Sequence, residues 1–254
     1  MNITVPALAK LTVSLAVTGR RADGMHLLDA EMVTVDLADE LVFSEGDGLD
    51  VIVAYDRSGD GADAVVGDDD NLVRKALRAV GRRAHVRLTK RIPPGAGLGG
   101  GSADAAAVFR WAGVADPALA ATVGADVAFC VRGGRARVSG IGEVVDPLPP
   151  RLRTFTLALA PFGCSTAEVY RAWDRLGGPT GEGARNDLET AALSVEPRLA
   201  AWRDRLAVAT KQPPVLAGSG STWFVEGDFP GDDRIVVRTA TPPAIPGTTA
   251  RTIR

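Results

Sequence analysis

Alternation of apolar and polar residues predicts a series of β-strands. The clearest runs from Lys10 to Gly19, where every second residue from Leu11 to Val17 is apolar. This period of two is typical of a strand with one buried and one solvated face, and Lys10 and Thr12 would share the solvated face. Similar patterns predict strands at 26–43 (two strands with a kink near 36–40), 47–55, 86–89, 152–160, 215–225 (a strand pair) and 234–240, and a hairpin at 135–147.

Apolar residues at helical spacing predict the helices, at 71–82, 114–122, 165–176 and 186–209. Ser165 and Glu168 stand at capping-box spacing, so the third helix begins at Ser165. Pro197 interrupts the last stretch, which is compatible with one helix or two. The segment 56–70 is rich in Gly and Asp and poor in apolar residues, and we expect a loop there.

The order of these elements predicts an α+β fold in two domains. In the second half, helices would cover one face of an antiparallel sheet. The proline-rich seam Pro147–Pro150 is the best candidate for a boundary. We therefore expect one domain over residues 1–148 and another over 149–254.

Composition narrows the classes of function. The 254 residues are 46% hydrophobic and 24% charged, with a net charge of −2, as in globular proteins that have no general attraction to nucleic acid. Two cysteines cannot form a disulfide framework, which favours a reducing compartment. The sequence shows no apolar run long enough for a signal peptide or a membrane span. We expect a cytoplasmic protein with no membrane partner, as a monomer or a homodimer.

The strongest chemical signal lies between the strand at 86–89 and the residues that follow it. Pro93 and Pro94 end the strand, five glycines fall within 95–101, and Ser102 then stands at the expected N-cap of a run of helix formers. Amides in such a loop can point at an anion, and the N-terminus of a helix adds partial positive charge. A plain turn needs one or two glycines, so the pattern favours a phosphate-binding loop over a flexible connector.

Three known phosphate-loop patterns come close but do not fit. Gly95, Gly97 and Gly100 satisfy the dinucleotide fingerprint G-x-G-x-x-G, but a Pro-Pro step separates them from the strand. The P-loop pattern requires a lysine where Gly101 stands. The chain contains neither the H-R-D nor the D-F-G motif of protein kinases. What remains is P-P-G-x-G-L-G-G-G-S-x-D-A-A.

This remaining pattern resembles the phosphate loop of the GHMP kinases, which include the galactose, homoserine and mevalonate kinases. The likeness implies the family's two-domain fold, with a mixed α/β N-terminal domain and a ferredoxin-like C-terminal domain. It also implies ATP, Mg²⁺ and phosphorylation of a hydroxyl. The triple glycine is most like the branch whose alcohol is a methylerythritol bearing cytidine diphosphate, in non-mevalonate isoprenoid synthesis. The likeness continues in order through 9–11, 19–26, 71–73, 124–127, 140–143, 186–189 and 217–221.

The resemblance implies a role for each matching position. It makes Asp126 the general base and Lys10 the cation that attracts the phosphoryl oxygens. The positions implied for ATP are Asn71, Lys90, Pro94, Gly95, Gly97, Leu98, Gly99, Gly100, Gly101 and Ser102. Those implied for the alcohol are Thr12, Met25, His26, Gly218, Ser219 and Gly220. The metal ligands stay open.

Plainer interpretations exist for single residues. Taken alone, Asp126 would be a helix cap and Lys10 an exposed charge on a strand; Lys90 is equally well interpreted as a surface lysine. Two of the positions implied for the alcohol also depart from the family. Thr12 stands where the family has asparagine, and Met25 stands where a tyrosine stacks on the cytosine. Two alternatives therefore stay open: a GHMP-type kinase for a different small alcohol, and a non-catalytic relative that binds a nucleotide.

Overall fold

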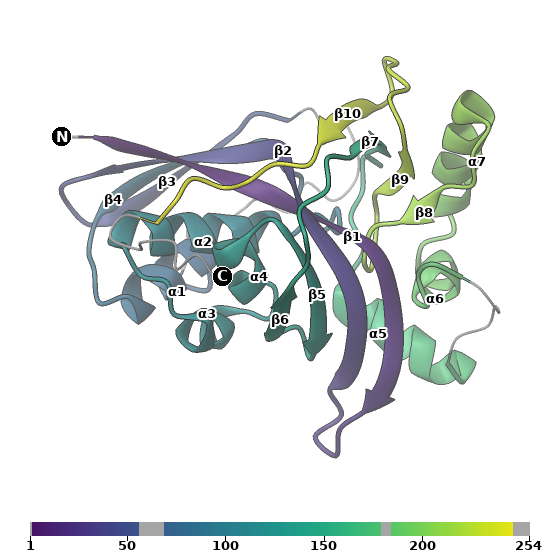
Figure 1. Cartoon of the computed structure of the whole chain (residues 1–254), viewed down its shortest axis with the longest axis horizontal. Coiled ribbons are helices and arrows are strands. Elements are labelled where there is room, and N and C mark those ends of the chain that lie inside the picture. Colours follow the sequence, from purple (N-terminus) through teal and green to yellow (C-terminus); the bar gives the residue numbers. More distant parts are fainter. Residues whose placement is uncertain (1, 56–68, 179–183, 246–254) are drawn as a thin grey trace.

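The computed structural model describes residues 2–55, 69–178 and 184–245. Most of the loop predicted at 56–70 lies outside the described residues, as does the end of the chain after residue 245. Two β-sheets with their own sets of helices lie side by side, and two long strands from the first half reach across toward the second (Figure 1).

The first sheet is built on the long antiparallel pair β1 and β2. Its strands are β1 (Ile3–Arg20), β2 (His26–Ser44), β3 (Gly48–Val53), β4 (His85–Lys90), β5 (Arg135–Gly140) and β6 (Val144–Pro147). The order is β3-β4-β2-β5-β6, with β1 also paired to β2. The predicted break near 36–40 is not a break, because β2 is one strand. Its register against β1 shifts between Leu8 and Lys10, which is a bulge that bends the strand without ending it.

Four helices belong to this half: α1 (Leu72–Ala79), α2 (Gly100–Ala112), α3 (Pro117–Val123) and α4 (Val127–Arg132). The central one, α2, contacts β1, β2 and the other three helices. Its run of small residues, with Ala103 and 105–107 fully covered, allows this close approach. The prediction that Ser102 caps α2 is wrong. Gly99 is the N-cap, in the left-handed region with φ 65°, so the helix begins at Gly100 and Ser102 lies in its first turn.

The second half forms an antiparallel sheet of four strands, β7 (Thr154–Ala158), β8 (Val215–Leu216), β9 (Trp223–Glu226) and β10 (Ile235–Arg238). Three helices accompany it: α5 (Thr166–Leu176), α6 (Glu189–Val195) and α7 (Leu199–Thr210). Ser165 caps α5 by accepting the amide of Glu168, and Pro197 separates α6 from α7, as predicted. The strand order β10-β7-β9-β8 is that of a ferredoxin-like sheet. The predicted α+β fold is confirmed, whereas the boundary at residue 148 stays a prediction.

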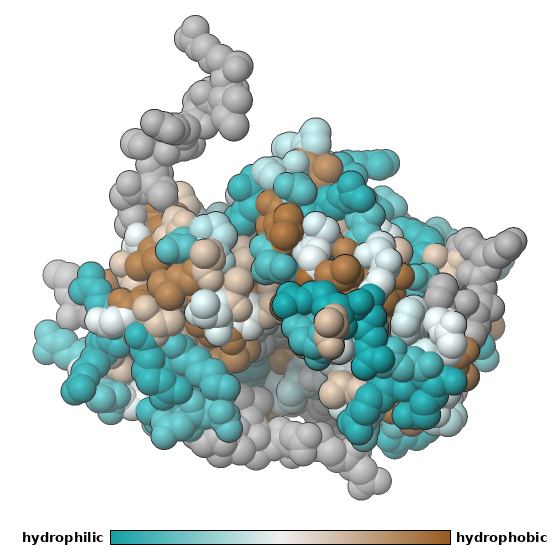
Figure 2. All heavy atoms as spheres, turned by 90° about the horizontal axis from the view of Figure 1, so that it is seen from below, coloured by the Kyte–Doolittle hydropathy of each residue, from teal (hydrophilic) through white to brown (hydrophobic). Residues whose placement is uncertain are grey.

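The glycine loop joins the two halves. Gly95 accepts hydrogen bonds from the amides of Cys164 and Ser221, each at 3.0 Å, and Ala96 accepts one from Thr222 at 3.2 Å. On the other side, the amide of Lys10 in β1 donates to Leu98 at 3.0 Å. Seen from below, hydrophobic patches are exposed at the centre and to the upper left, next to larger hydrophilic areas (Figure 2). The loop is therefore fixed at the junction, and it is not a free connector.

Candidate active site

A cavity of about 910 Å³ opens between the glycine loop, the β1–β2 pair, the N-terminus of α4 and α5. Most residues that the sequence singled out line it, including the two candidate catalytic residues. They are Lys10, Thr12, Met25, His26, Pro94, Gly95, Gly97, Gly99, Gly100, Gly101, Ser102, Asp126, Gly218 and Ser219. Within the described part of the chain, Asn71, Lys90, Leu98 and Gly220 do not line it.

Lys10 is buried, so the prediction of a solvated strand face is wrong for this residue and for Thr12. Lys10 is only 6% exposed and Thr12 is almost completely covered. The cover comes from two glycine-rich loops: a β-carbon on Gly99 would lie 2.8 Å from Lys10 Cγ, and one on Gly218 would lie 3.5 Å from Lys10 Nζ. The alternating pattern predicted the strand correctly. It could not show that loops from both halves close over that face.

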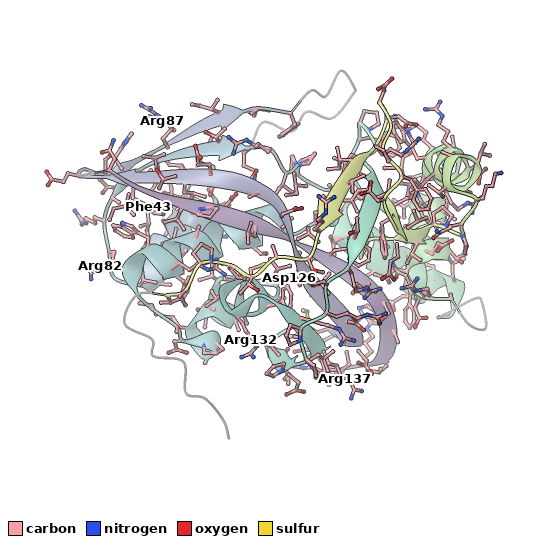
Figure 3. All side chains as sticks on the ribbon, turned by 45° about the horizontal axis from the view of Figure 1, so that its top comes forward. Phe43, Arg82, Arg87, Asp126, Arg132 and Arg137 are labelled. Carbon is pink, nitrogen blue, oxygen red and sulfur yellow. The ribbon has the colours of Figure 1, made fainter. Side chains whose placement is uncertain are left out.

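Lys10 and Asp126 form an ion pair, with Nζ 3.3 Å from Oδ2. The ammonium also donates to Thr12 Oγ1 at 3.1 Å. Asp126 precedes α4 as its N-cap residue, but its side chain makes no capping hydrogen bond and stays 30% exposed toward the cavity. It lies near the middle of the molecule, whereas Arg82 and Arg87 project at the periphery (Figure 3). The interpretation of Asp126 as a capping side chain is therefore wrong, and so is that of Lys10 as an exposed charge.

The glycine loop has a conformation that other residues would not adopt easily. Gly97 and Gly99 have φ angles of 76° and 65°, in the left-handed region. A β-carbon on Gly97 would come 2.0 Å from the carbonyl oxygen of Ala217. The loop leads directly into the N-terminus of α2, where the helix dipole favours an anion. This geometry fits a bound phosphate chain.

The far end of the cavity carries an aromatic group that sequence reasoning missed. His26 stacks on Tyr170 of α5, with ring centroids 4.7 Å apart, and meets Trp173 edge-on at 5.5 Å. His26 Nε2 lies 2.8 Å from Asp174 Oδ1. Tyr170 lines the cavity. Burial, and to a smaller degree the charge of Asp126, raises the pKa of Tyr170, so the phenol stays neutral. Tyr170 and Asp174 are four residues apart and so share one face of α5, and this spacing could have identified them as a pair from the sequence.

Asn186 holds the loop that approaches Lys10 from the second half. Its Nδ2 donates to the carbonyls of Leu216 at 2.8 Å and Gly218 at 2.7 Å, and its Oδ1 accepts the amide of Leu188 at 2.9 Å. The residue is almost fully buried. It stands in a segment that resembled the family, but the sequence alone gave it no role.

Comparison with known proteins identifies the family. The family described as GHMP kinases N terminal domain matches residues 71–134. A 4-diphosphocytidyl-2-C-methyl-D-erythritol kinase of Paracoccus denitrificans is 36% identical over 234 residues, which cover 85% of this chain and 84% of the relative. The chain belongs to the GHMP kinase family. A kinase of the same name from Cereibacter sphaeroides is 37% identical over 246 residues, covering 86% of this chain and 87% of that protein.

Solved structures agree with this assignment. The crystal structure of a 4-(cytidine 5'-diphospho)-2C-methyl-D-erythritol kinase superposes with a TM-score of 0.67 and 32% identity. The match covers 87% of this chain and 89% of that one. The family resemblance inferred from the motifs is thus confirmed, and the chain is an ATP-dependent small-molecule kinase of the GHMP type.

Three positions expected to bind ATP, Asn71, Lys90 and Leu98, do not line the cavity of this GHMP kinase. Lys90 is buried and paired with Asp39 and Asp104, so its interpretation as a surface lysine is wrong. The side chain of Asn71 caps α1 by accepting the amide of Val73 at 2.9 Å, while the adjacent Leu72 lines the cavity. Direct contact between Asn71 and a nucleotide stays a prediction.

The described residues contain no cluster of three His, Cys, Asp or Glu side chains that could hold a metal on its own. In the same part of the chain, no helix has the length and apolar character to cross a membrane.

Proposed function

We propose that this GHMP kinase transfers the γ-phosphoryl group of ATP to a hydroxyl of 4-diphosphocytidyl-2-C-methyl-D-erythritol. Relatives with that kinase name match most of its length at 36–37% identity. The observation that carries the proposal is the Lys10–Asp126 pair at 3.3 Å. It lies in one cavity with the glycine loop and with the His26–Tyr170 stack.

The reaction needs a base, a cation and precise placement of two substrates. The Asp126 carboxylate accepts the proton of the substrate hydroxyl as its oxygen bonds to the γ-phosphorus. The bond from that phosphorus to the bridging oxygen of ADP breaks, and ADP leaves with the electron pair. Lys10 lies beside Asp126, where its charge attracts the phosphoryl oxygens and holds the carboxylate in place. The backbone of 95–101 and the start of α2 hold the triphosphate.

Mg²⁺ fits this site as the companion of ATP. The ion is usually bound through one or two protein oxygens together with phosphates and water. The Ser102 hydroxyl, in the first turn of α2 and on the cavity wall, is an oxygen of the kind it takes. When bound, the metal neutralises negative charge on the phosphates.

The His26 end of the cavity suits a cytosine. Met25, which replaces the tyrosine of the family, is 46% exposed and offers no π face. Tyr170 supplies an aromatic face from α5 instead, next to an imidazole that Asp174 orients. We infer that a base lies against the His26–Tyr170 pair, since both residues line the cavity. This arrangement favours the cytidyl substrate over the alternative of an unrelated small alcohol.

The test is an ADP-release assay with a panel of alcohols, run on the wild type and on Asp126→Ala. We expect turnover with the cytidyl substrate, and a loss of kcat of about 10²–10⁴-fold in the variant while ATP affinity stays nearly unchanged. Turnover with another alcohol but not with the cytidyl compound would contradict the proposed substrate while leaving the kinase activity intact. ATP binding without turnover of any alcohol would favour a non-catalytic relative. An Asp126→Ala variant with the kcat of the wild type would show that Asp126 is not the general base.

A further inference from the structure

Three charged side chains are buried behind the glycine loop. Lys90 ends β4, Asp39 lies in β2 and Asp104 lies in α2, and none of them is more than 3% exposed. The Lys90 ammonium donates to Asp104 Oδ2 at 2.7 Å and also to Asp39 Oδ2. The cluster therefore ties together β2, the strand that leads into the loop and the helix that leads out of it.

Asp39 holds the entry to the loop. Its other oxygen, Oδ1, accepts the backbone amides of Arg91 and Ile92, the latter at 2.7 Å. These two residues connect β4 to Pro93, where the loop begins. The first residues of the loop are thus held by a carboxylate that Lys90 itself holds.

Lys90 and Asp104 hold the exit from the loop. Asp104 lies one helical turn after Gly100, the first residue of α2. A β-carbon on Gly100 would come 3.1 Å from Lys90 Nζ, so the ammonium packs close to the backbone at the start of the helix. Because Gly100 lines the cavity, a shift of the ammonium would move part of the surface that faces the phosphates.

One cation and two carboxylates are costly to bury. Asp104 Oδ1 finds no hydrogen-bond partner among the described residues. Burial raises the pKa of Asp104 to about 7, although the charge of Lys90 opposes this shift. Apolar side chains of similar size would often pack in such a place at lower cost. The cluster is therefore a poor source of stability, and the orientation that it imposes on the loop is the better account of its presence.

We propose that Lys90, Asp39 and Asp104 are positioning residues that set the geometry of the glycine loop for ATP. The proposal rests on the kinase function proposed above. It gives Lys90 a part in ATP binding without contact, since the ammonium is engaged by two carboxylates and does not line the cavity. It predicts that damage to the cluster weakens ATP binding and leaves the alcohol and the chemical step largely unaffected.

The test compares Asp104→Ala with Asp104→Asn by titration with Mg²⁺-ATP and by steady-state kinetics. Asp104→Ala should raise the Kd and KM for ATP about tenfold, with kcat at saturating ATP and KM for the alcohol within about threefold of wild type. Asp104→Asn keeps an acceptor for Lys90 and should restore ATP affinity to within about threefold. Asp39→Asn is the second variant if Asp104→Ala does not fold, and it should weaken ATP binding by about threefold or more.

Val108→Ala is the control for lost stability, because Val108 is fully buried on the same helix and lies outside the cluster. It should unfold at lower denaturant concentration and still bind ATP like the wild type. Folded Asp104→Ala and Asp39→Asn proteins that bind ATP like the wild type would overturn the proposal, as would an equal loss of affinity in Val108→Ala. A wild type that binds no ATP would instead overturn the kinase function and this proposal together.

Discussion

His26 lies against Tyr170 with the two rings 25° from parallel, and Asp174 fixes the imidazole from the same helix as Tyr170. The contact joins β2 in the first half to α5 in the second. We propose that Tyr170 provides the stacking face that Met25 cannot provide. The substrate end of the cavity is therefore formed by both halves, and Tyr170 is the residue on which its specificity is expected to depend.

Tyr170→Ala should weaken recognition of the cytidyl substrate. Loss of a base–aromatic stack is worth about 1–3 kcal/mol, so the KM for this alcohol should rise by roughly tenfold to a hundredfold. Tyr170→Phe keeps the aromatic face and should stay within about twofold of wild type. The KM for ATP, measured in the same assays, should not change in either variant. If Tyr170→Ala had the KM of the wild type for the alcohol, the cytosine would not stack on Tyr170.

Gly97→Ala should abolish ATP binding in a protein that still folds. The added β-carbon would meet the Ala217 carbonyl oxygen at 2.0 Å, and the φ of 76° disfavours any side chain. The loop must then move away from 217–220. Gly81→Ala is the matched control, since Gly81 also has positive φ but no atom of the described residues lies within 4 Å of its added β-carbon. Nucleotide titration measures the affinity of both variants for ATP. An equal loss of affinity in Gly97→Ala and Gly81→Ala would contradict the prediction.

The pattern of the chain predicted the strands and most helices, because alternation and capping are local properties. It missed the burial of Lys10, which depends on Gly218 from the other half of the chain. It misplaced the start of α2, because a glycine in the left-handed region took the N-cap from Ser102. It passed over Tyr170, since an aromatic residue on an amphipathic helix is usually part of the core. Local patterns specify elements, whereas the site depends on contacts between them.

Asp104 should make the stability of the protein depend on pH. The pKa of its carboxyl is about 7 in the folded protein and 3.8 ordinarily. Between these values the folded state holds a proton that the unfolded chain has released. The resulting stabilisation is complete below the lower value and is lost as pH rises through 7.

The variant Asp104→Asn carries an amide that does not titrate, so the two proteins should differ in this dependence. Going from pH 5 to pH 8, the free energy of unfolding of the wild type should fall relative to that of the variant by about 2–3 kcal/mol. Denaturant titrations of both proteins at the two pH values measure this difference. A constant difference between the two curves would show that the carboxyl does not titrate in this range.

Asn186 should control the loop that covers Lys10. Its Nδ2 group donates to the carbonyls of Leu216 and Gly218, and both bonds are lost in Asn186→Ala. Two buried carbonyls without partners cost about 1–3 kcal/mol each, so the midpoint of unfolding should fall clearly.

The same variant should lose activity beyond its loss of stability. Gly218 approaches the Lys10 ammonium and the Thr12 hydroxyl, so a displaced loop changes the surroundings of the ion pair with Asp126. We expect kcat to fall by about tenfold or more at a temperature where the variant is fully folded. Ser194→Ala serves as the control, because its hydroxyl donates to the nearby Ala191 carbonyl within α6, far from the Asn186 loop bonds. An Asn186→Ala enzyme that is destabilised but has normal kcat would show that the loop supports the fold without placing Lys10.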